Sequence, residues 1–183
     1  MIKLLCIAGK AGAGKDTIAR DLVTSNPNLF SFVTSFTSRP MREKEVEGKD
    51  YFFISKDEFI NKIDSGEMLE WSFFNDWYYG TTEQSFDKEK INVCVCNPDG
   101  IRSFTELGFD MTVVYVYADD KTRLLRQLNR EKDPDVAEIC RRYQADEANF
   151  KDLKYDVLVT NANRSWSMAT QDIVCWLLQK GKI

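Results

Sequence analysis

The 183-residue chain contains no histidine, and its five cysteines form no C-x-x-C pair. A structural zinc site needs cysteine and histidine ligands in closely spaced pairs, so the sequence argues against one. Basic residues are not in excess either, because 25 lysines and arginines stand against 29 acidic residues and leave a net charge of −4. General nucleic-acid binders and proteins that bind acidic membranes present a strongly basic face, so we expect neither kind of partner.

The chain also lacks long apolar runs, internal repeats and low-complexity linkers. Its first apolar stretch, residues 2–8, turns at once into a glycine-rich loop, so we expect neither a signal peptide nor a membrane span. Cys6, Cys94 and Cys96 lie in apolar, strand-like runs, as expected for reduced, buried thiols of a cytoplasmic protein. A chain of this length can bury a core without disulfides or metals.

Hydrophobic periodicity predicts strands that alternate with helices along most of the chain. The expected strands cover residues 2–8, 30–36, 51–55, 67–75, 77–81, 91–97, 111–118 and 155–161. The expected helices cover residues 14–24, 55–64, 99–107, 120–130, 133–152 and 164–180. Ser55 with Glu58 is typical of a capping box, and Asp133 is the expected cap of the fifth helix. This alternation predicts an α/β fold with a parallel central sheet flanked by helices, interrupted at 36–88 by a small antiparallel insert.

Residues 9–17, GKAGAGKDT, nearly complete the phosphate loop G-x-x-x-x-G-K-[ST]. Between a strand and a helix, such glycines let backbone N–H groups converge on phosphate, and the lysine reaches the β- and γ-phosphates. We therefore expect a functional phosphate loop, with a nucleotide bound by Gly9, Gly12, Ala13, Gly14, Lys15, Asp16 and Thr17.

Asp16 stands where the motif has a hydroxyl that binds Mg²⁺. A carboxylate is also a hard oxygen ligand, which makes Asp16 the candidate magnesium residue. The alternative is a solvated aspartate that the dipole of the helix N-terminus favours. Thr17 carries a hydroxyl but should point elsewhere on the helix.

The next stretch, TSFTSRPMREKEVEGKDYFF (34–53), places two arginines three residues apart. Arg39 and Arg42, with Tyr51 and Ser35 nearby, can hold a phosphate dianion through charge-assisted hydrogen bonds. Composition alone slightly favours a solvated charged loop.

This segment, with GEMLEWSFFNDWYYGTT (66–82) and RRYQADEANFKDLKYDVLVTNAN (141–163), resembles the guanylate kinase family over most of the chain. The resemblance implies a P-loop kinase fold in a single domain over 1–183. Residues 1–35 and 89–183 would form the core, 36–88 the acceptor-binding insert, and about 126–145 a helical lid. It also implies cytoplasmic transfer of the γ-phosphate of ATP, bound with Mg²⁺, to GMP or dGMP.

The resemblance implies a role for each acceptor residue. Glu70 would accept hydrogen bonds from guanine N1–H and the 2-amino group, a donor pair that adenine lacks. Ser35 and Thr81 would bond guanine O6, and Asn97 would complete the base site. The acceptor phosphate would be bound by Arg39, Arg42, Tyr51 and Tyr79. The residues themselves also allow an exposed strand position for Glu70 and core packing for Tyr79.

The lid is implied to close over the triphosphate with Arg126, Arg130 and Arg142, which stabilise charge on the transferring phosphoryl group. The chain is one residue longer than the family pattern before Arg142, so Arg141 is the alternative. A salt-bridged helix surface is the alternative, since Arg142 has Glu138 and Asp146 at i±4. Asn161 matches a position near the donor adenine, and a turn asparagine is equally consistent. The implied catalytic set is Lys15, Arg39, Arg42, Arg130 and Arg142.

Val95 and Asn97 depart from the family pattern, which has acidic residues at these positions. Asp16 could replace the carboxylate that is lost there. Asn97 leaves room for a deoxynucleoside monophosphate kinase of broader base range, and a ribose-bisphosphate kinase of related sequence is a further alternative. A guanylate-kinase-like binding module characteristically loses the phosphate loop and lid, whereas Lys15 and the arginines are present here.

Overall fold

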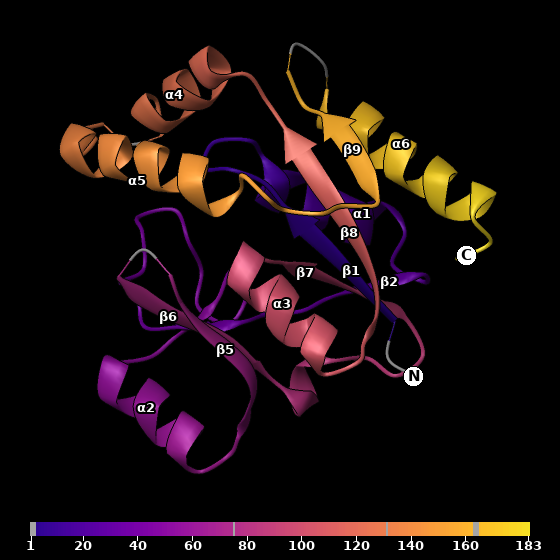
Figure 1. Cartoon of the computed structure of the whole chain (residues 1–183), viewed down its shortest axis with the longest axis horizontal. Helices are drawn as coiled ribbons and strands as arrows, with labels where there is room; N and C mark the ends of the chain where they lie inside the picture. Colours follow the sequence, from indigo (N-terminus) through magenta and orange to yellow (C-terminus); the bar gives the residue numbers. More distant parts are fainter. Residues whose placement is uncertain (1–2, 75, 131, 163–164) are drawn as a thin grey trace.

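The computed structural model describes residues 3–74, 76–130, 132–162 and 165–183 (Figure 1). Within these ranges the central sheet has five parallel strands in the order β2-β7-β1-β8-β9. The strands are β1 (Lys3–Ala8), β2 (Phe30–Phe32), β7 (Ile91–Val95), β8 (Asp110–Tyr117) and β9 (Val157–Thr160). The predicted α/β class with a parallel central sheet is therefore confirmed.

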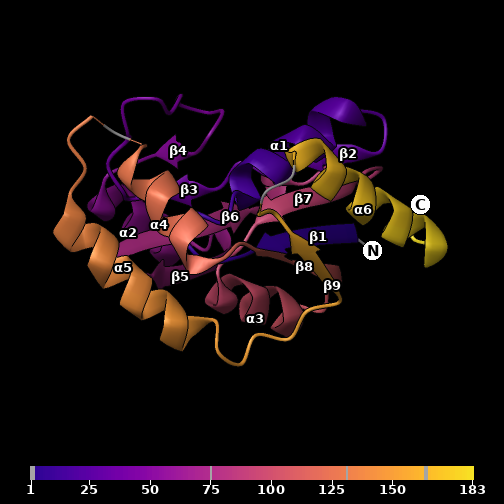
Figure 2. The ribbon, with the colours of Figure 1, turned by 90° about the horizontal axis from the view of Figure 1, so that it is seen from above.

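Helices cover both faces of the central sheet, as Figure 2 shows. Helices α1 (Lys15–Ser25) and α6 (Trp166–Gln179) lie on one face, and α3 (Pro98–Glu106) lies on the other. Because successive strand residues point to opposite faces, Leu5 and Ile7 belong to the first core cluster while Leu4 and Cys6 belong to the second. Burial on both faces explains why β1 is a continuous apolar run.

Two further helices, α4 (Asp120–Leu128) and α5 (Val136–Asn149), follow β8. The α4 helix is capped by Asp119, whose side chain accepts a hydrogen bond from the backbone N–H of Thr122. The cap of α5 is Asp135, which accepts from the N–H of Glu138, so the prediction of Asp133 is wrong. Both aspartates suit a cap chemically, and only the path of the chain distinguishes them.

Residues 36–82 contain a second sheet, in the order β4-β3-β6-β5. Its strands are β3 (Phe36–Thr37), β4 (Phe52–Phe53), β5 (Met68–Phe74) and β6 (Trp77–Thr82). The sheet is mixed, because β3–β6 and β5–β6 are antiparallel whereas β3–β4 is parallel, which departs from the antiparallel arrangement expected. Helix α2 (Lys56–Asp64) carries the predicted capping box of Ser55 and Glu58, and a 3₁₀ turn, η1 (Glu83–Ser85), follows β6.

The predicted strand over 30–36 is wrong as a single element. Its first part is β2, which pairs with β7 in the central sheet, and its last residue begins β3, which pairs with β6 in the second sheet. The chain therefore passes from one sheet to the other within residues 33–35. Across the described ranges, none of the helices has the length and apolar character needed to cross a bilayer.

Candidate active site

The phosphate loop connects β1 to α1, and its glycines are required by geometry. Gly12 and Gly14 have φ of 80° and 92°, a region that residues with a Cβ rarely adopt. A Cβ on Gly12 would lie 2.5 Å from the carbonyl oxygen of Arg123, and one on Gly14 would lie 2.3 Å from Asn161 Nδ2. Gly14 caps α1, so Lys15 opens the helix at the end where its dipole favours anions.

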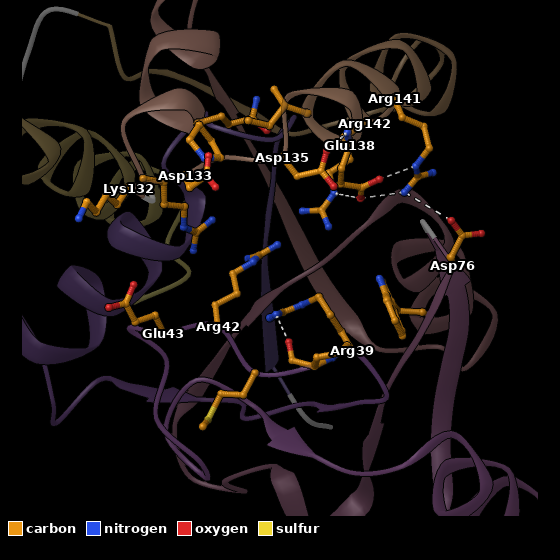
Figure 3. Close-up of a pocket in the computed structure, with 17 residues that line it drawn as sticks. Arg39, Arg42, Glu43, Asp76, Lys132, Asp133, Asp135, Glu138, Arg141 and Arg142 are labelled. Carbon is orange, nitrogen blue, oxygen red and sulfur yellow. Dashed lines mark hydrogen bonds and ion pairs between the residues drawn. The ribbon is translucent and has the colours of Figure 1, made fainter.

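A cavity of about 410 Å³ joins this loop to the second sheet and to α4 and α5. The predicted site residues that line it are Gly9, Gly12, Gly14, Lys15, Asp16, Thr17, Ser35, Arg39, Arg42, Tyr51, Glu70, Tyr79, Asn97, Arg126, Arg130 and Arg142. Three others lie buried behind the lining: Ala13, Thr81 and Asn161. A second, more open cavity of about 790 Å³ lies beside it and shares the arginines 39, 42, 130 and 142 (Figure 3).

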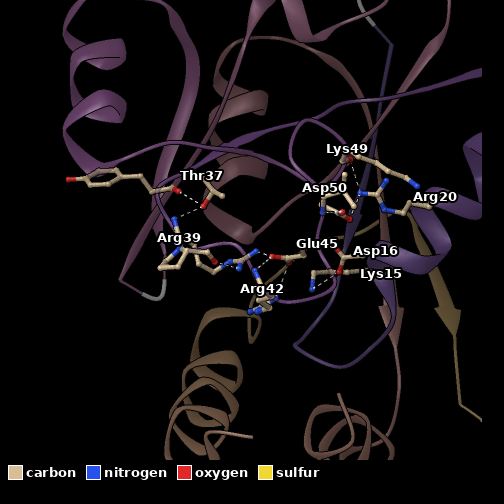
Figure 4. A network of polar contacts seen from close by, with 12 residues as sticks. Lys15, Asp16, Arg20, Thr37, Arg39, Arg42, Glu45, Lys49 and Asp50 are labelled. Carbon is tan, nitrogen blue, oxygen red and sulfur yellow. Dashed lines mark hydrogen bonds and ion pairs between the residues drawn. The ribbon is translucent and has the colours of Figure 1, made fainter. Parts of the chain in front are cut away.

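The arginine pair after β3 is held by a carboxylate that the sequence analysis did not single out. Glu45 Oε1 accepts from Arg39 Nη2 at 2.8 Å and lies 3.5 Å from Arg42 Nη1, while Oε2 accepts from the Arg42 N–H at 2.8 Å (Figure 4). Arg39 is only 5% exposed and Arg42 is half-buried, so these two arginines are not solvated as composition favoured, whereas residues 43–44 and 46–49 of the same segment are exposed. Burial alone would raise the pKa of Glu45, but these hydrogen bonds lower it, which keeps Glu45 ionised.

Positive charge is concentrated in this part of the cavity. Burial lowers the pKa of Arg42, and the neighbouring guanidinium groups of Arg39, Arg130 and Arg142 lower it further. Burial raises the pKa of Tyr51 well above its usual range, so its phenol stays protonated and can donate a hydrogen bond. The arrangement suits a phosphate dianion.

Glu70 is buried in the wall of the same cavity. It lies on β5 opposite Thr81 on β6, and Thr81 Oγ1 donates to Glu70 Oε1 at 2.9 Å. The residue is 8% exposed, so the exposed-strand alternative does not apply. Burial raises the pKa of Glu70 to about 7, and the hydrogen bonds from Thr81 only partly offset the effect.

Asn97 uses both ends of its amide within the protein. Its Oδ1 accepts from the N–H of Gly100 at 2.7 Å and caps α3, and its Nδ2 donates to Ser72 Oγ at 3.0 Å. Ser72 is a further cavity residue that the sequence analysis missed. Its position two residues after Glu70, on the same face of β5, was the available signal.

Asp16 lies at the entrance of the helix, beside Lys15. Its side chain is 57% exposed, and Oδ2 is 3.7 Å from Lys15 Nζ (Figure 4). Desolvation would raise the pKa of Asp16, but Lys15 and Arg130 outweigh it and lower the pKa. The cavity therefore contains, next to the phosphate loop, an ionised carboxylate that can act as a metal ligand.

The arginines of α4 and α5 differ in what they contact. Arg126 donates to the carbonyls of Gly12 and Ala13, both at 3.3 Å, and to that of Asn161 at 2.8 Å. The side chain of Asn161 also binds the loop, because Nδ2 donates to the Ala13 carbonyl at 2.7 Å. Both residues thus support the backbone of the phosphate loop.

Arg142 and Arg141 share Glu138, but only Arg142 also reaches the cavity at the phosphate loop. Arg142 is 22% exposed and lines both cavities, whereas Arg141 is 41% exposed and lines only the more open one. Arg141 also lies 3.5 Å from Asp76, on the turn before β6 (Figure 3). Hydrogen bonds from Arg141 and Arg142 lower the pKa of Glu138 to about 2, against the weaker opposing effect of burial.

Asp146 also lines the cavity, but its contacts differ from those expected from the sequence. The spacing suggested a surface ion pair with Arg142, but Asp146 is 2% exposed and accepts from the N–H of Ala11 at 2.6 Å. The helical spacing identified the face of α5 correctly. It carried no sign that this face meets the phosphate loop.

The fold and the cavity together define a class of protein. A phosphate loop on a parallel sheet faces, across one cavity, a second small sheet with paired arginines and a buried carboxylate. These are the parts of a P-loop nucleoside monophosphate kinase. The chain belongs to the guanylate kinase family, because the model of that family, described as guanylate kinase, matches residues 1–169.

Individual relatives agree with this assignment. The chain is 35% identical over 171 residues to the guanylate kinase of Thermotoga maritima, covering 88% of this chain and 80% of that protein. It is 30% identical over 173 residues to the guanylate kinase of Chlamydia felis, covering 91% and 84%. The crystal structure of the guanylate kinase from Anaplasma phagocytophilum superposes with a TM-score of 0.69 over 98% of this chain and 86% of that one. At 20% identity, this last match speaks for the shared fold alone.

Proposed function

We propose that this nucleoside monophosphate kinase transfers the γ-phosphoryl group of ATP, bound with Mg²⁺, to GMP or dGMP. The observation that carries the proposal is Glu70, a buried carboxylate held by Thr81 in the cavity that also contains Lys15 and the arginines. Thr81 occupies one oxygen of the carboxylate as a donor, and the remaining lone pairs can accept from guanine N1–H and the 2-amino group. Adenine presents an acceptor at N1, so it would leave Glu70 unpaired.

The acceptor phosphate is proposed to bind Arg39 and Arg42, with Tyr51 and Tyr79 as phenol donors. Glu45 already holds both guanidinium groups in this cavity, so they are oriented before the substrate arrives. Preorganised donors cost little reorganisation when the phosphate binds. Ser35 would complete the site at the base, as the resemblance implies.

The donor triphosphate is proposed to bind the phosphate loop, with Lys15 on the β- and γ-phosphates. The lid arginines proposed for the transferring group are Arg130 and Arg142, both of which line the cavity. In-line transfer needs no strong base, and these residues act by positioning the phosphates and neutralising charge.

The residues present fit a magnesium ion. Asp16 offers an ionised carboxylate beside the phosphate loop, and hard oxygen ligands are what Mg²⁺ prefers. We propose Asp16 as the protein residue that holds the ion, directly or through water. When bound, the ion neutralises charge on the phosphates.

A broader base range is the second candidate function, and the contacts of Asn97 favour it. Both ends of its amide are engaged by Gly100 and Ser72, so Asn97 adds little discrimination for the guanine edge. Base choice would then depend on Glu70 and Thr81 alone. We also propose a cytoplasmic location, which the buried thiols Cys6, Cys94 and Cys96 favour.

The test is a panel of nucleoside monophosphates with ATP, measured as ADP formation. We expect GMP and dGMP to be used at least tenfold better, by kcat/KM, than the adenine, cytosine and thymine monophosphates. Similar use of several bases would support the broader kinase, and no turnover with any acceptor would contradict the proposal. Lys15→Ala serves as the control for background ATP hydrolysis.

A further inference from the structure

The tip of the phosphate loop is held by two side chains from outside the loop. Asp146 Oδ2 accepts from the backbone N–H of Ala11 at 2.6 Å, and Arg123 Nε donates to the Ala11 carbonyl at 3.1 Å. Arg123 Nη2 also lies 3.6 Å from Asp146 Oδ2, so the two side chains form an ion pair. Both polar backbone groups of Ala11 are thus bound by one charged pair.

This pair is more deeply buried than the Arg39–Glu45 pair, whose side chains are 6% and 10% exposed. Arg123 and Asp146 are each 2% exposed. Removing two charges from water is costly, and a buried pair is weak support for stability by itself. Within the residues that the structure describes, Arg123 Nη2 has no hydrogen-bond partner, because its contact with Asp146 is too long. Such an arrangement suggests that the pair serves a positioning role.

Further contacts fix Arg123 in place. Its Nη1 lies 3.0 Å from Asp120 Oδ1 and 3.7 Å from Glu147 Oε1, and its guanidinium lies 4.7 Å from the centre of the Tyr143 ring. The carbonyl oxygen of Arg123 lies where a Cβ on Gly12 would come within 2.5 Å. The backbone of α4 therefore packs directly on the loop, and carboxylates from both helices, Asp120 on α4 and Asp146 and Glu147 on α5, surround the Arg123 guanidinium.

The same two helices carry two of the arginines that line the cavity. Arg126 lies three residues after Arg123 on α4 and donates to the carbonyls of Gly12 and Ala13. Arg142 lies four residues before Asp146 on α5, and both line the cavity. The contacts at Ala11 thus fix the distance between the phosphate loop and the arginine side chains.

We propose that Arg123 and Asp146 are a positioning pair that joins the phosphate loop to α4 and α5 and so determines how well the donor nucleotide binds. The inference rests on the proposed function, because it takes the loop to be the site of ATP. The pair touches the loop backbone and not the acceptor side of the cavity. Its loss should therefore weaken the donor and leave the acceptor nearly unaffected.

The test compares Asp146→Ala with Asp146→Asn. Alanine removes the acceptor for the Ala11 N–H and the one buried counter-charge of Arg123, leaving the more exposed Asp120 and Glu147, whereas asparagine keeps an acceptor oxygen of the same shape. We expect Asp146→Ala to raise the KM for ATP at least tenfold, with the KM for GMP within twofold of wild type. Asp146→Asn should recover part of the loss, and Arg123→Met should resemble Asp146→Ala.

The matched control is Val157→Ala, which removes buried apolar volume from the first residue of β9, whereas Asn161, beyond the end of this strand, contacts the loop; the substitution should lower the melting temperature. Its KM for ATP should stay at the wild-type value. The inference would be overturned if Asp146→Ala raised the KM values for ATP and GMP equally. It would also be overturned if Asp146→Ala changed the KM for ATP no more than Val157→Ala does. If the alanine variant does not fold, Asp146→Asn and Arg123→Met must show the donor-specific increase or the inference fails.

Calorimetric titration with ADP separates this inference from the proposed function. Weaker ADP binding by Asp146→Ala, together with no turnover of any acceptor by wild type, would support the positioning role of the pair and contradict the proposed kinase function. Turnover of GMP by wild type, with unchanged ADP affinity in Asp146→Ala, would contradict the positioning role of the pair and support the proposed kinase function.

Discussion

Glu70→Gln tests the buried carboxylate through both stability and base recognition. Burial raises the pKa of Glu70 from 4.5 to about 7, which means that the folded protein binds this proton more tightly than the unfolded chain does. The wild type therefore loses stability as pH rises from about 4.5 to about 7. Glutamine keeps the oxygen that accepts from Thr81 and cannot ionise, so the variant does not lose this contribution.

The size of the effect follows from the shift in pKa. At about 1.36 kcal/mol for each pH unit, the rise from 4.5 to about 7 corresponds to an upper limit of about 3 kcal/mol. We expect the variant to gain up to this amount in free energy of unfolding, relative to wild type, between pH 4.5 and pH 8. Urea denaturation of both proteins at several pH values measures it, provided that each unfolds in a single transition.

Although Glu70→Gln should be more stable than wild type, its kcat/KM for GMP should be lower. In the proposed mode of recognition guanine needs the ionised carboxylate, and losing a hydrogen bond to a charged group costs about 1.5–3 kcal/mol, which is roughly 10- to 150-fold in kcat/KM for GMP at pH 8. Because the pKa of Glu70 is raised to about 7, most of wild-type Glu70 is protonated at pH 5.5, so the difference in kcat/KM between the two proteins should narrow there.

The phosphate of GMP itself titrates near pH 6, but this contribution is the same for both proteins and cancels in their ratio. A wild-type to variant ratio that does not change with pH would refute the assignment. So would an equal loss for ATP.

Three further sets of substitutions probe the remaining parts of the site. Arg42→Lys keeps the charge but not the planar fork, so kcat/KM for GMP should fall roughly tenfold or more while the KM for ATP stays the same; wild-type kinetics would remove Arg42 from the acceptor site. Asp16→Ala should need much more Mg²⁺ than wild type for half-maximal turnover, and Asp16→Ser should need an intermediate concentration. Identical Mg²⁺ titrations of turnover for all three proteins would mean that Asp16 does not bind the ion. Arg142→Gln should lower kcat at least tenfold and Arg141→Gln less than threefold, because only Arg142 lines the inner cavity, and the reverse order would exchange their roles.

Local patterns in the sequence were sufficient for much of the fold. The phosphate loop, the capping box of Ser55 and Glu58, and the buried run of β1 each depend on a few neighbouring residues, and each could be predicted. The alternating stretch over 30–36 was misread because periodicity reports a strand but not its partner. Its two ends pair with β7 and β6, which lie far along the chain.

The site shows the same division between local and distant information. The resemblance to the guanylate kinase family singled out Glu70, Arg39 and Arg42, and all three line the cavity. The contacts of Glu45 and Asp146 could not be predicted, because an acidic residue in a charged stretch looks alike whether it faces water or closes on a buried partner. Their partners were decided only when the arginine loop and α5 were folded against the cavity.

Because Glu45 already contacts the guanidinium groups of Arg39 and Arg42, any anion from solution must compete with it for these two arginines. A carboxylate attached six residues from one arginine and three from the other acts as a tethered ligand, with an effective concentration on the order of millimolar or higher. Singly charged ions in solution compete poorly with such a neighbour, since they offer no more charge than it already supplies. A phosphate dianion brings twice the charge and three oxygens, so it can engage both guanidinium groups at once. The internal carboxylate would thus act as a filter that admits doubly charged phosphates and turns away chloride and carboxylic acids.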